Sequence, residues 1–265
     1  MRLRFALGLA VCAVGFAVRT LKAETVPVRY PEGLVHGFLT LSAVDGAVLA
    51  EGDQIQFLRD GRVTSRLLLK FRDGSVHDET AVFTQDKVFR LVSDRLIQKG
   101  PSFPTPLDLS IDAKTGIVAV RYTDDGKPKS VEEKMDLPPD LANGLVLMLI
   151  KNLDPKAPLT TVSMIAASPK PRLVRLAISP AGETTFVVGT SRRQSVRFVV
   201  HVELGGIAGV IAPLVGKQPP DTHVWVVEGD APGFIGAEGP LAMGAPPWRL
   251  ELASPAAPRR GAAGR

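Results

Sequence analysis

The stretch from Glu51 to Gly100 decides the fold and reads EGDQIQFLRDGRVTSRLLLKFRDGSVHDETAVFTQDKVFRLVSDRLIQKG. Segments rich in Val, Leu, Phe and Thr are separated by the pairs Asp60-Gly61 and Asp73-Gly74, and a third pair, Asp45-Gly46, lies just upstream. Glycine readily adopts the positive φ that short hairpin loops demand, so each pair marks a chain reversal. The stretch therefore predicts an antiparallel β-meander.

Between the last two Asp-Gly pairs, apolar and polar residues alternate with a period of two, as they do on a strand with one covered face and one wet face. The apolar set is Val63, Leu67, Leu69 and Phe71, and the polar set is Arg62, Thr64, Arg66, Lys70 and Arg72. At Asp60-Gly61, a two-residue loop pairs Phe57 with Thr64, whereas a three-residue loop pairs Phe57 with Val63. We expect the second register because it matches apolar with apolar residues.

The strand after Asp73-Gly74 is unusual because both of its faces carry polar groups. One face has Val76, Asp78, Thr80 and Val82, and the other has Ser75, His77, Glu79, Ala81 and Phe83. We expect an edge or flared strand with a charged rim. The alternative is a strand that lines a partly wet cavity.

Residues 1–23 have the pattern of a secretory signal peptide. Arg2 and Arg4 precede an uncharged apolar run from Phe5 to Val18, which is shorter than the approximately 20 residues of a membrane-spanning helix. We expect the mature chain to start near Glu24, to carry no transmembrane segment and to be periplasmic or secreted. Cys12 is the only cysteine and would be lost with the leader, so the mature chain has no disulfide. A lipoprotein leader is the alternative, but Val11 is larger than the residue usually found before a lipidated cysteine.

The charge of the chain argues against nucleic acid as a partner. It carries 32 Lys and Arg and 27 Asp and Glu residues. The leader holds four of the basic residues and no acidic one, which leaves 28 against 27, and three more arginines lie after residue 253, which leaves 25 against 27. A body this close to neutrality is a poor match for a polyphosphate.

One segment predicts a helix. Residues 141–153 are apolar on nearly every side, with Pro138-Pro139 before them and Asp154-Pro155 after them. A helix of this kind belongs inside, so we expect it to plug the sheet, with Gly144 packed closely against a strand. A second β block follows, at residues 161–167, 173–178, 184–189, 195–204, 222–227 and 248–252.

The sequence thus predicts a mostly β protein, an antiparallel meander forming an open barrel or curved sheet around one central helix. We expect one β-rich domain over residues 24–253, because chains of this length bury most of their unfolded surface. The Pro, Ala and Gly composition of residues 254–265 predicts a disordered tail.

Two motifs support a family resemblance. They are the segment DLPPDLANG at 136–144, which opens the helix, and the strand Val-Trp-Val-Val at 224–227, which an acidic turn and a closing strand follow. In these motifs and in the order of its elements, the chain resembles a family of secreted bacterial proteins known as a domain of unknown function. The resemblance implies an envelope protein with an open, barrel-like β fold and no catalytic residues to carry over.

A metal site could be drawn from His201 and Glu203, which share a strand face, and His223 on a later strand. Three such ligands would suit zinc. The alternative is that they are ordinary half-buried polar residues on strands. The sequence contains no Gly-x-Ser-x-Gly elbow and no phosphate-binding P-loop, so we expect neither catalytic residues nor a cofactor.

Residues 204–216, LGGIAGVIAPLVG, contain no charge in thirteen positions. They form either a buried connection under the sheet or an apolar flap over a ligand cavity. In the second case Ile207, Val210, Ile211 and Leu214 face the ligand.

The resulting hypothesis is an exported envelope protein that binds or carries an apolar or amphiphilic molecule, such as a lipid, without catalysis. The alternative is an interaction or assembly factor that works through a sheet edge. A metal-dependent enzyme using His201, Glu203 and His223 is the third hypothesis.

Overall fold

The structure is a computed structural model that describes residues 25–103, 105–124, 126–168, 170–188, 190–203 and 218–253. The expected signal peptide, the apolar stretch 204–216 and the expected tail lie outside these residues.

The described chain is almost entirely β-structure, and one short helix follows the eighth strand. The elements are β1(Val35–Ala43), β2(Val48–Arg59), β3(Arg62–Phe71), β4(Val76–Gln85), β5(Phe89–Lys99), β6(Leu107–Asp112), β7(Ile117–Asp124), β8(Lys127–Lys134), α1(Val146–Asn152), β9(Thr160–Ser168), β10(Lys170–Val188), β11(Ser191–Glu203), β12(Thr222–Val227), β13(Gly233–Gly239) and β14(Trp248–Leu252). Within the described ranges, no helix is long and apolar enough to cross a membrane.

All of these strands join one antiparallel sheet in the order β8-β7-β6-β5-β4-β3-β2-β1-β14-β13-β12-β11-β10-β9. The sheet consists of two meanders, β1 to β8 and β9 to β14, joined where the first strand pairs with the last. Its two edges, β8 and β9, are neighbours in sequence, and the connection between them contains α1. The predicted fold class, an antiparallel meander curved around one helix, is confirmed.

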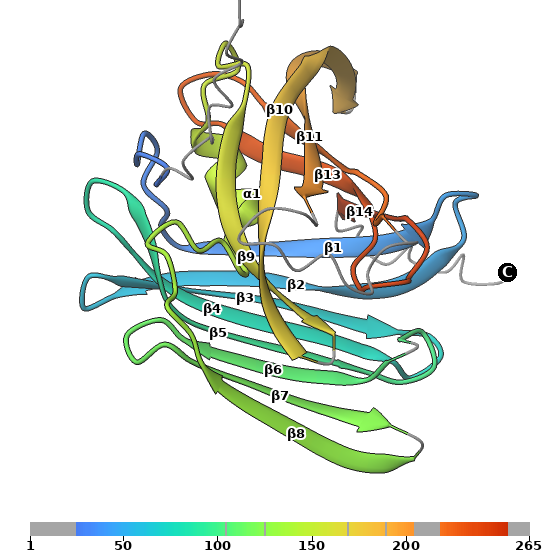
Figure 1. The fold of residues 1–265 in the computed structure, drawn as a ribbon. Coiled ribbons are helices and arrows are strands. Elements are labelled where there is room, and N and C mark those ends of the chain that lie inside the picture. The colour runs from blue at the N-terminus through green and yellow to red at the C-terminus, as the bar shows by residue number, and fades with distance from the viewer. Residues whose placement is uncertain are drawn as a thin grey trace, which may run out of the picture.

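The sheet curls over itself without closing into a barrel (Figure 1). The second meander lies above the first, and β10 contacts β7 across the interior. Helix α1 lies between the two meanders and contacts β12 and β13. The interior is therefore bounded by the concave faces of both halves of one sheet.

The turn at Asp60-Gly61 corrects one predicted register. The loop has two residues, with φ of 50° at Asp60 and 72° at Gly61, and Phe57 pairs with Thr64 rather than with Val63. Two successive positive φ values define the hairpin turn whose twist matches that of the flanking strands. Turn geometry thus prevails over apolar pairing, and Phe57 is left exposed.

Strand β4 corrects a second expectation. It is not an edge strand, because it pairs along its whole length with β3 on one side and with β5 on the other. Its residues His77, Glu79 and Ala81 face the interior and line a cavity there. The alternative interpretation, a strand lining a partly wet cavity, is the correct one.

Helix α1 is shorter than predicted, beginning at Val146 instead of Leu141. The reason is Gly144, whose φ of 64° lies outside the helical region. The preceding residues run beside the edge strand β9 instead: the Asn143 side chain bonds both the N–H and the C=O of Ile165, at 2.8 and 3.0 Å. This segment satisfies part of a sheet edge that would otherwise be open.

The expected close packing of Gly144 is confirmed. A Cβ at this position would lie 2.7 Å from the Cβ of Ala81 and 2.9 Å from Oδ1 of Asp94. We expect Gly144→Ala to lower the free energy of unfolding by about 1 to 3 kcal/mol, because left-handed backbone is strained for alanine and the strands must move aside. Urea titration measures this loss. Gly33→Ala, at a site with open space, is the control, and an equal loss in both variants would contradict the prediction.

Two apolar clusters divide the interior. The larger contains α1 residues such as Leu149 and Ile150 together with side chains from both meanders, including Phe83 and Val224. The smaller is built around three rings, Phe71, Phe103 and Trp248, which meet edge to face. The core is thus packed at two places and not continuously between them.

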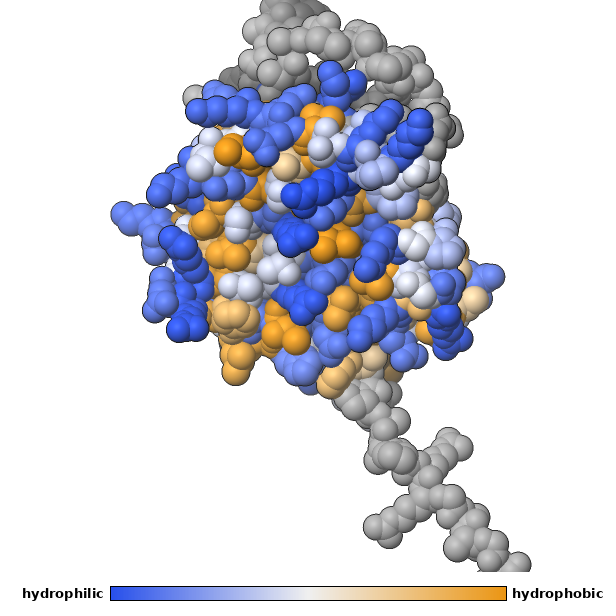
Figure 2. Space-filling model, turned by 90° about the horizontal axis from the view of Figure 1, so that it is seen from below, coloured by the Kyte–Doolittle hydropathy of each residue, from blue (hydrophilic) through white to orange (hydrophobic). Residues whose placement is uncertain are grey.

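The convex face of the first meander carries ion pairs across neighbouring strands. Arg66 holds Asp78 with two bonds of 2.7 and 2.8 Å, and Asp108 accepts from Arg95 and Arg121. Figure 2 shows hydrophilic and apolar side chains interspersed on the side where Figure 1 draws this meander. These exposed pairs contribute little stability, so they identify the wet face of the sheet.

Candidate functional site

A cavity of about 370 Å³ lies between the two clusters. Leu41, Leu67 and Trp248 bound it on the side of the smaller cluster, and Met148 and Leu176 bound it on the other. Most of its remaining wall is also apolar, and its size falls within the range of ligand pockets in proteins.

The cavity reaches the surface beside Lys170, Pro220 and Met243, which line it and are exposed. A molecule can therefore enter without unfolding the sheet.

Polar residues gather on one wall, where β4 and β5 run side by side. His77 and Glu79 occupy alternate positions of β4, and Gln98 on β5 lies directly opposite His77. Next to them, Gln54 donates to Ser65 at 2.6 Å and also lines the cavity. The wall is thus polar in one place and apolar elsewhere, which is the usual composition of a ligand site.

The hydrogen bonds of Gln98 determine the tautomer of His77. The Nε2 atom of Gln98 donates to the carbonyl oxygen of Leu241 at 2.7 Å, so the amide nitrogen must lie on this side, and it also bonds Nδ1 of His77 at 3.1 Å. Because an amide nitrogen only donates, Nδ1 accepts, and the proton of the neutral ring is on Nε2. His77 is 3% exposed and its Nε2 has no partner, so it presents an unused donor.

Two carboxyl groups lie farther along the same face of β4 and β5. Glu79 lines the cavity and makes no hydrogen bond or ion pair within the described chain. Asp94 on β5 pairs with Ala81, one diagonal step from Glu79 on the same face, and both of its buried oxygens lack partners.

Burial raises the pKa of Glu79 to about 7, and burial together with the Glu79 carboxyl raises the pKa of Asp94 well above its usual range. Burial lowers the pKa of His77 to about 4, so its ring is neutral at pH 7. The pKa of Glu79 lies near neutral pH, so this carboxyl changes charge around pH 7.

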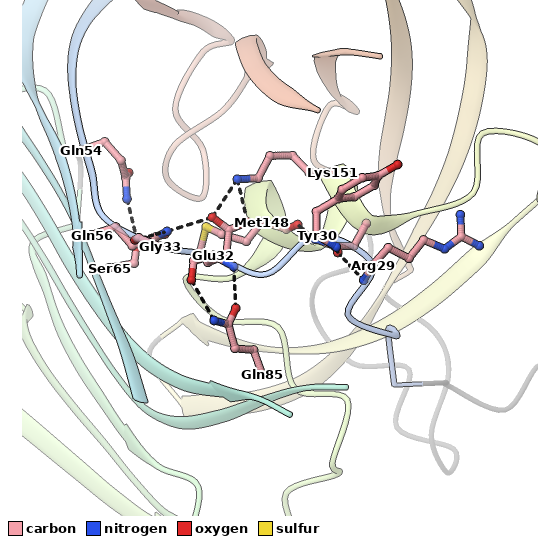
Figure 3. A network of polar contacts seen from close by, with 11 residues as sticks. Arg29, Tyr30, Glu32, Gly33, Gln54, Gln56, Ser65, Gln85, Met148 and Lys151 are labelled. Carbon is pink, nitrogen blue, oxygen red and sulfur yellow. Dashed lines mark hydrogen bonds and ion pairs between the residues drawn. The ribbon is translucent and has the colours of Figure 1, made fainter. Parts of the chain in front are cut away.

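A separate polar network fixes the interior end of α1 (Figure 3). Lys151 and Glu32 form an ion pair of 2.7 Å, and their side chains are 18% and 5% exposed. Glu32 also accepts from Gln56 at 2.8 Å, and Gln85 bonds both its backbone N–H and its C=O. Asn152 accepts two backbone N–H groups of the same N-terminal segment. The network ties residues 29–33 to α1, β2 and β4 and so holds the helix against the sheet.

The predicted ligand-binding residues Ile207, Val210, Ile211 and Leu214 lie outside the described residues. Val200 on β11 and Val224 on β12 line the cavity. The three residues of the hypothetical metal site, His201, Glu203 and His223, occupy the alternate positions of these strands, so they lie on the outer face, away from the cavity. His201 bonds Asp221 at 2.6 Å. In the described part of the chain, no three His, Cys, Asp or Glu side chains are grouped to hold a metal ion.

Glu79 and Asp94 are candidate site residues that the sequence interpretation did not single out. The sequence contains a signal for Glu79. Ser75, His77, Glu79 and Ala81 are spaced two residues apart and share a strand face with Phe83, which is buried, so this face is the interior one. Asp94 had no comparable signal, because a bulge between Val82 and Phe83 shifts the pairing of β4 with β5.

No family model matches the sequence, and no curated protein matches it. Among solved structures, the chain is similar to a beta-barrel-like protein of the domain of unknown function DUF1849 from Brucella abortus. The two share 12% sequence identity with a TM-score of 0.44, over 84% of this chain and 98% of the other.

Proposed function

We propose that this protein is an exported envelope protein that binds an apolar or amphiphilic molecule in the cavity between its two meanders and performs no chemistry on it. The observation that carries the proposal is the unfilled space of about 370 Å³ between two packed clusters. Close packing is the rule in protein interiors, so a cavity of this size is costly unless it is used.

The composition of the wall supports an amphiphilic ligand. Leu, Val, Ile and Met side chains would bury an apolar chain, and the polar wall of β4 and β5 would receive a head group. The sheet edge, the working surface under the alternative hypothesis, is less suited to recruiting a partner strand. The residues of β8 include Lys127, Glu132, Glu133 and Lys134, and charges of this kind discourage edge pairing.

A fluorescent apolar probe tests the proposal. We expect N-phenyl-1-naphthylamine to bind the purified protein with increased fluorescence and to be displaced by a long-chain alcohol. Leu147→Trp should weaken binding at least about tenfold, because Leu147 lines the cavity and the larger ring takes ligand space. Leu34→Trp, at a side chain 86% exposed, should leave binding unchanged.

Native mass spectrometry of protein purified from its own cell envelope should show a co-purifying small molecule. Absence of probe binding in the unmodified protein would contradict the binding function. Equal binding by both tryptophan variants would place the probe outside the cavity.

A further inference from the structure

The polar wall of the cavity has binding capacity that the protein itself does not use. Glu79 and Nε2 of His77 belong to residues that line the cavity, and neither has a hydrogen-bond partner among the described residues. Both oxygens of Asp94, a neighbour of Glu79 on β5, are also buried without a partner. Buried polar groups in proteins are nearly always paired, so an unpaired group facing a cavity indicates a missing partner. Two such groups on one wall, His77 and Glu79, indicate a ligand with a polar end.

The charge of these groups decides what that polar end is. Two carboxyl groups on neighbouring strands can share their site without repulsion only while a proton or another cation lies between or beside them. An anionic head group would add negative charge next to these carboxyl groups, whereas an ammonium group would neutralise the charge of Glu79.

We propose that the ligand is a long-chain amine whose ammonium group binds the Glu79 carboxylate while its chain lies against the apolar wall. The inference rests on the proposed binding function and names the class of molecule bound. In the empty protein a proton occupies the carboxyl site, and the ammonium group takes its place.

The surroundings of Glu79 are consistent with this role. From β5 it is faced by Asp94, whose pKa is raised well above its usual range by burial and by Glu79 itself, and on its own strand by His77, whose neutral ring offers an N–H. An oxygen next to the amine, such as a hydroxyl group, would accept that N–H. From β10, Lys170 and Arg172 line the same cavity. Residues 141–148, which approach from the helix side, contain no charged side chain.

Exchange of a proton for an ammonium group makes binding depend on pH. Glu79 has a pKa of about 7, so its ionised fraction rises about tenfold between pH 6 and pH 8. An alkylamine stays protonated throughout this range. Its affinity should therefore rise by about the same factor, and each binding event near pH 7 should release part of a proton.

The experiment is calorimetry of the whole protein with decylamine, decanol and decanoate, at pH 6 and pH 8 and in buffers of different ionisation enthalpy. We expect decylamine to bind about tenfold or more tightly than decanol at pH 8, and we expect its binding at pH 6 to release a proton. E79Q should remove this difference and the pH dependence. E51Q, the same change at an exposed position on the outside of β2, should bind all three compounds as the unmodified protein does.

The outcomes separate the inference from the function on which it rests. Equal binding of the three compounds would contradict the proposal of an amine ligand but would leave the cavity as a binding site. Tighter binding of decanoate would do the same, and it would assign the head group to Lys170 and Arg172. Failure of all three to bind would contradict the proposed function itself. Loss of decanol binding in E79Q would mean that the substitution acts on the fold, and thermal unfolding of the variant would show it.

Discussion

Lys151→Met should lower the free energy of unfolding by about 3 to 5 kcal/mol, because it leaves the carboxylate of Glu32 buried without its cation. Glu32 is 5% exposed in its side chain and lies 2.7 Å from the Lys151 ammonium group. The amide of Gln56 would remain as a donor to it, but a neutral donor does not replace a full charge. Chemical denaturation of the unmodified and variant proteins measures the difference.

The same part of the chain provides two controls. Arg29 pairs with Asp154 at 3.4 Å, and both side chains are more than 40% exposed, so Arg29→Met should cost under about 1 kcal/mol. In the double variant Glu32→Gln/Lys151→Met no charge is left unpaired, so much of the lost stability should return. If Lys151→Met lowers the free energy of unfolding as little as Arg29→Met does, then Glu32 is solvated and the network does not anchor α1.

The first meander could be predicted because local physics determines it. Asp-Gly pairs mark the turns after β1, β2 and β3, and the alternation in β3 separates its wet and covered faces. Each hairpin forms between neighbours in sequence, so its existence needs no knowledge of the rest of the chain. The register predicted at Asp60-Gly61 is wrong because it followed apolar side-chain pairing, whereas the positive φ of both turn residues determines the register.

The second meander shows where local signals fail. Two predicted strands are one, β10, which continues through a bulge at residues 180–183 that includes Gly182 with φ of 95°. Strand β13, Gly-Phe-Ile-Gly-Ala-Glu-Gly, was missed because three glycines in seven positions lower its β propensity. It forms because β12 and β14 flank it on both sides. Local signals also fail for β8, the edge strand of the first meander, which was missed because its charged pattern suits an edge and not a core.

The cavity could not be predicted because its wall comes from positions distant in sequence. Glu79 and Val224 line the same space although 145 residues separate them, and only the pairing of β1 with β14 brings their halves of the sheet together. A polar residue on an interior face can mean a satisfied core group, a rim or a site. Only the surrounding structure distinguishes these cases.

Glu79→Gln should change the free energy of unfolding of the empty protein, and this change should be about 3 kcal/mol more stabilising at pH 8 than at pH 4. The pKa of Glu79 is raised from 4.5 to about 7 in the folded protein, so between these values the folded state holds a proton that the unfolded state has released. The stabilisation is fully present below about pH 4.5 and is lost as the pH rises through 7. A shift of this size corresponds to about 3 kcal/mol. Glutamine cannot ionise, so the variant does not lose this stability as the pH rises.

The measurement is the free energy of unfolding of both proteins across this pH range, analysed as their difference. Asp94 contributes with the same sign as Glu79, because its pKa is also raised, and His77 contributes with the opposite sign between pH 4 and 6.5, because its pKa is lowered. Both groups remain in the variant, so most of their effect cancels in the difference. Glu51→Gln should show no such trend, and a flat difference for Glu79→Gln would mean that Glu79 is well solvated.

A saturating alkylamine should reverse this trend, and the reversal connects stability with function. An ammonium group beside Glu79 stabilises its charged form, so the unmodified protein with ligand should keep its stability up to pH 8, whereas Glu79→Gln should gain less from the amine than the unmodified protein does. A carboxylate that weakens the empty protein at neutral pH but strengthens the occupied one is costly only in the absence of its ligand. If the amine stabilises both proteins equally at pH 8, Glu79 does not contact the ammonium group, and its buried charge lacks a role in binding.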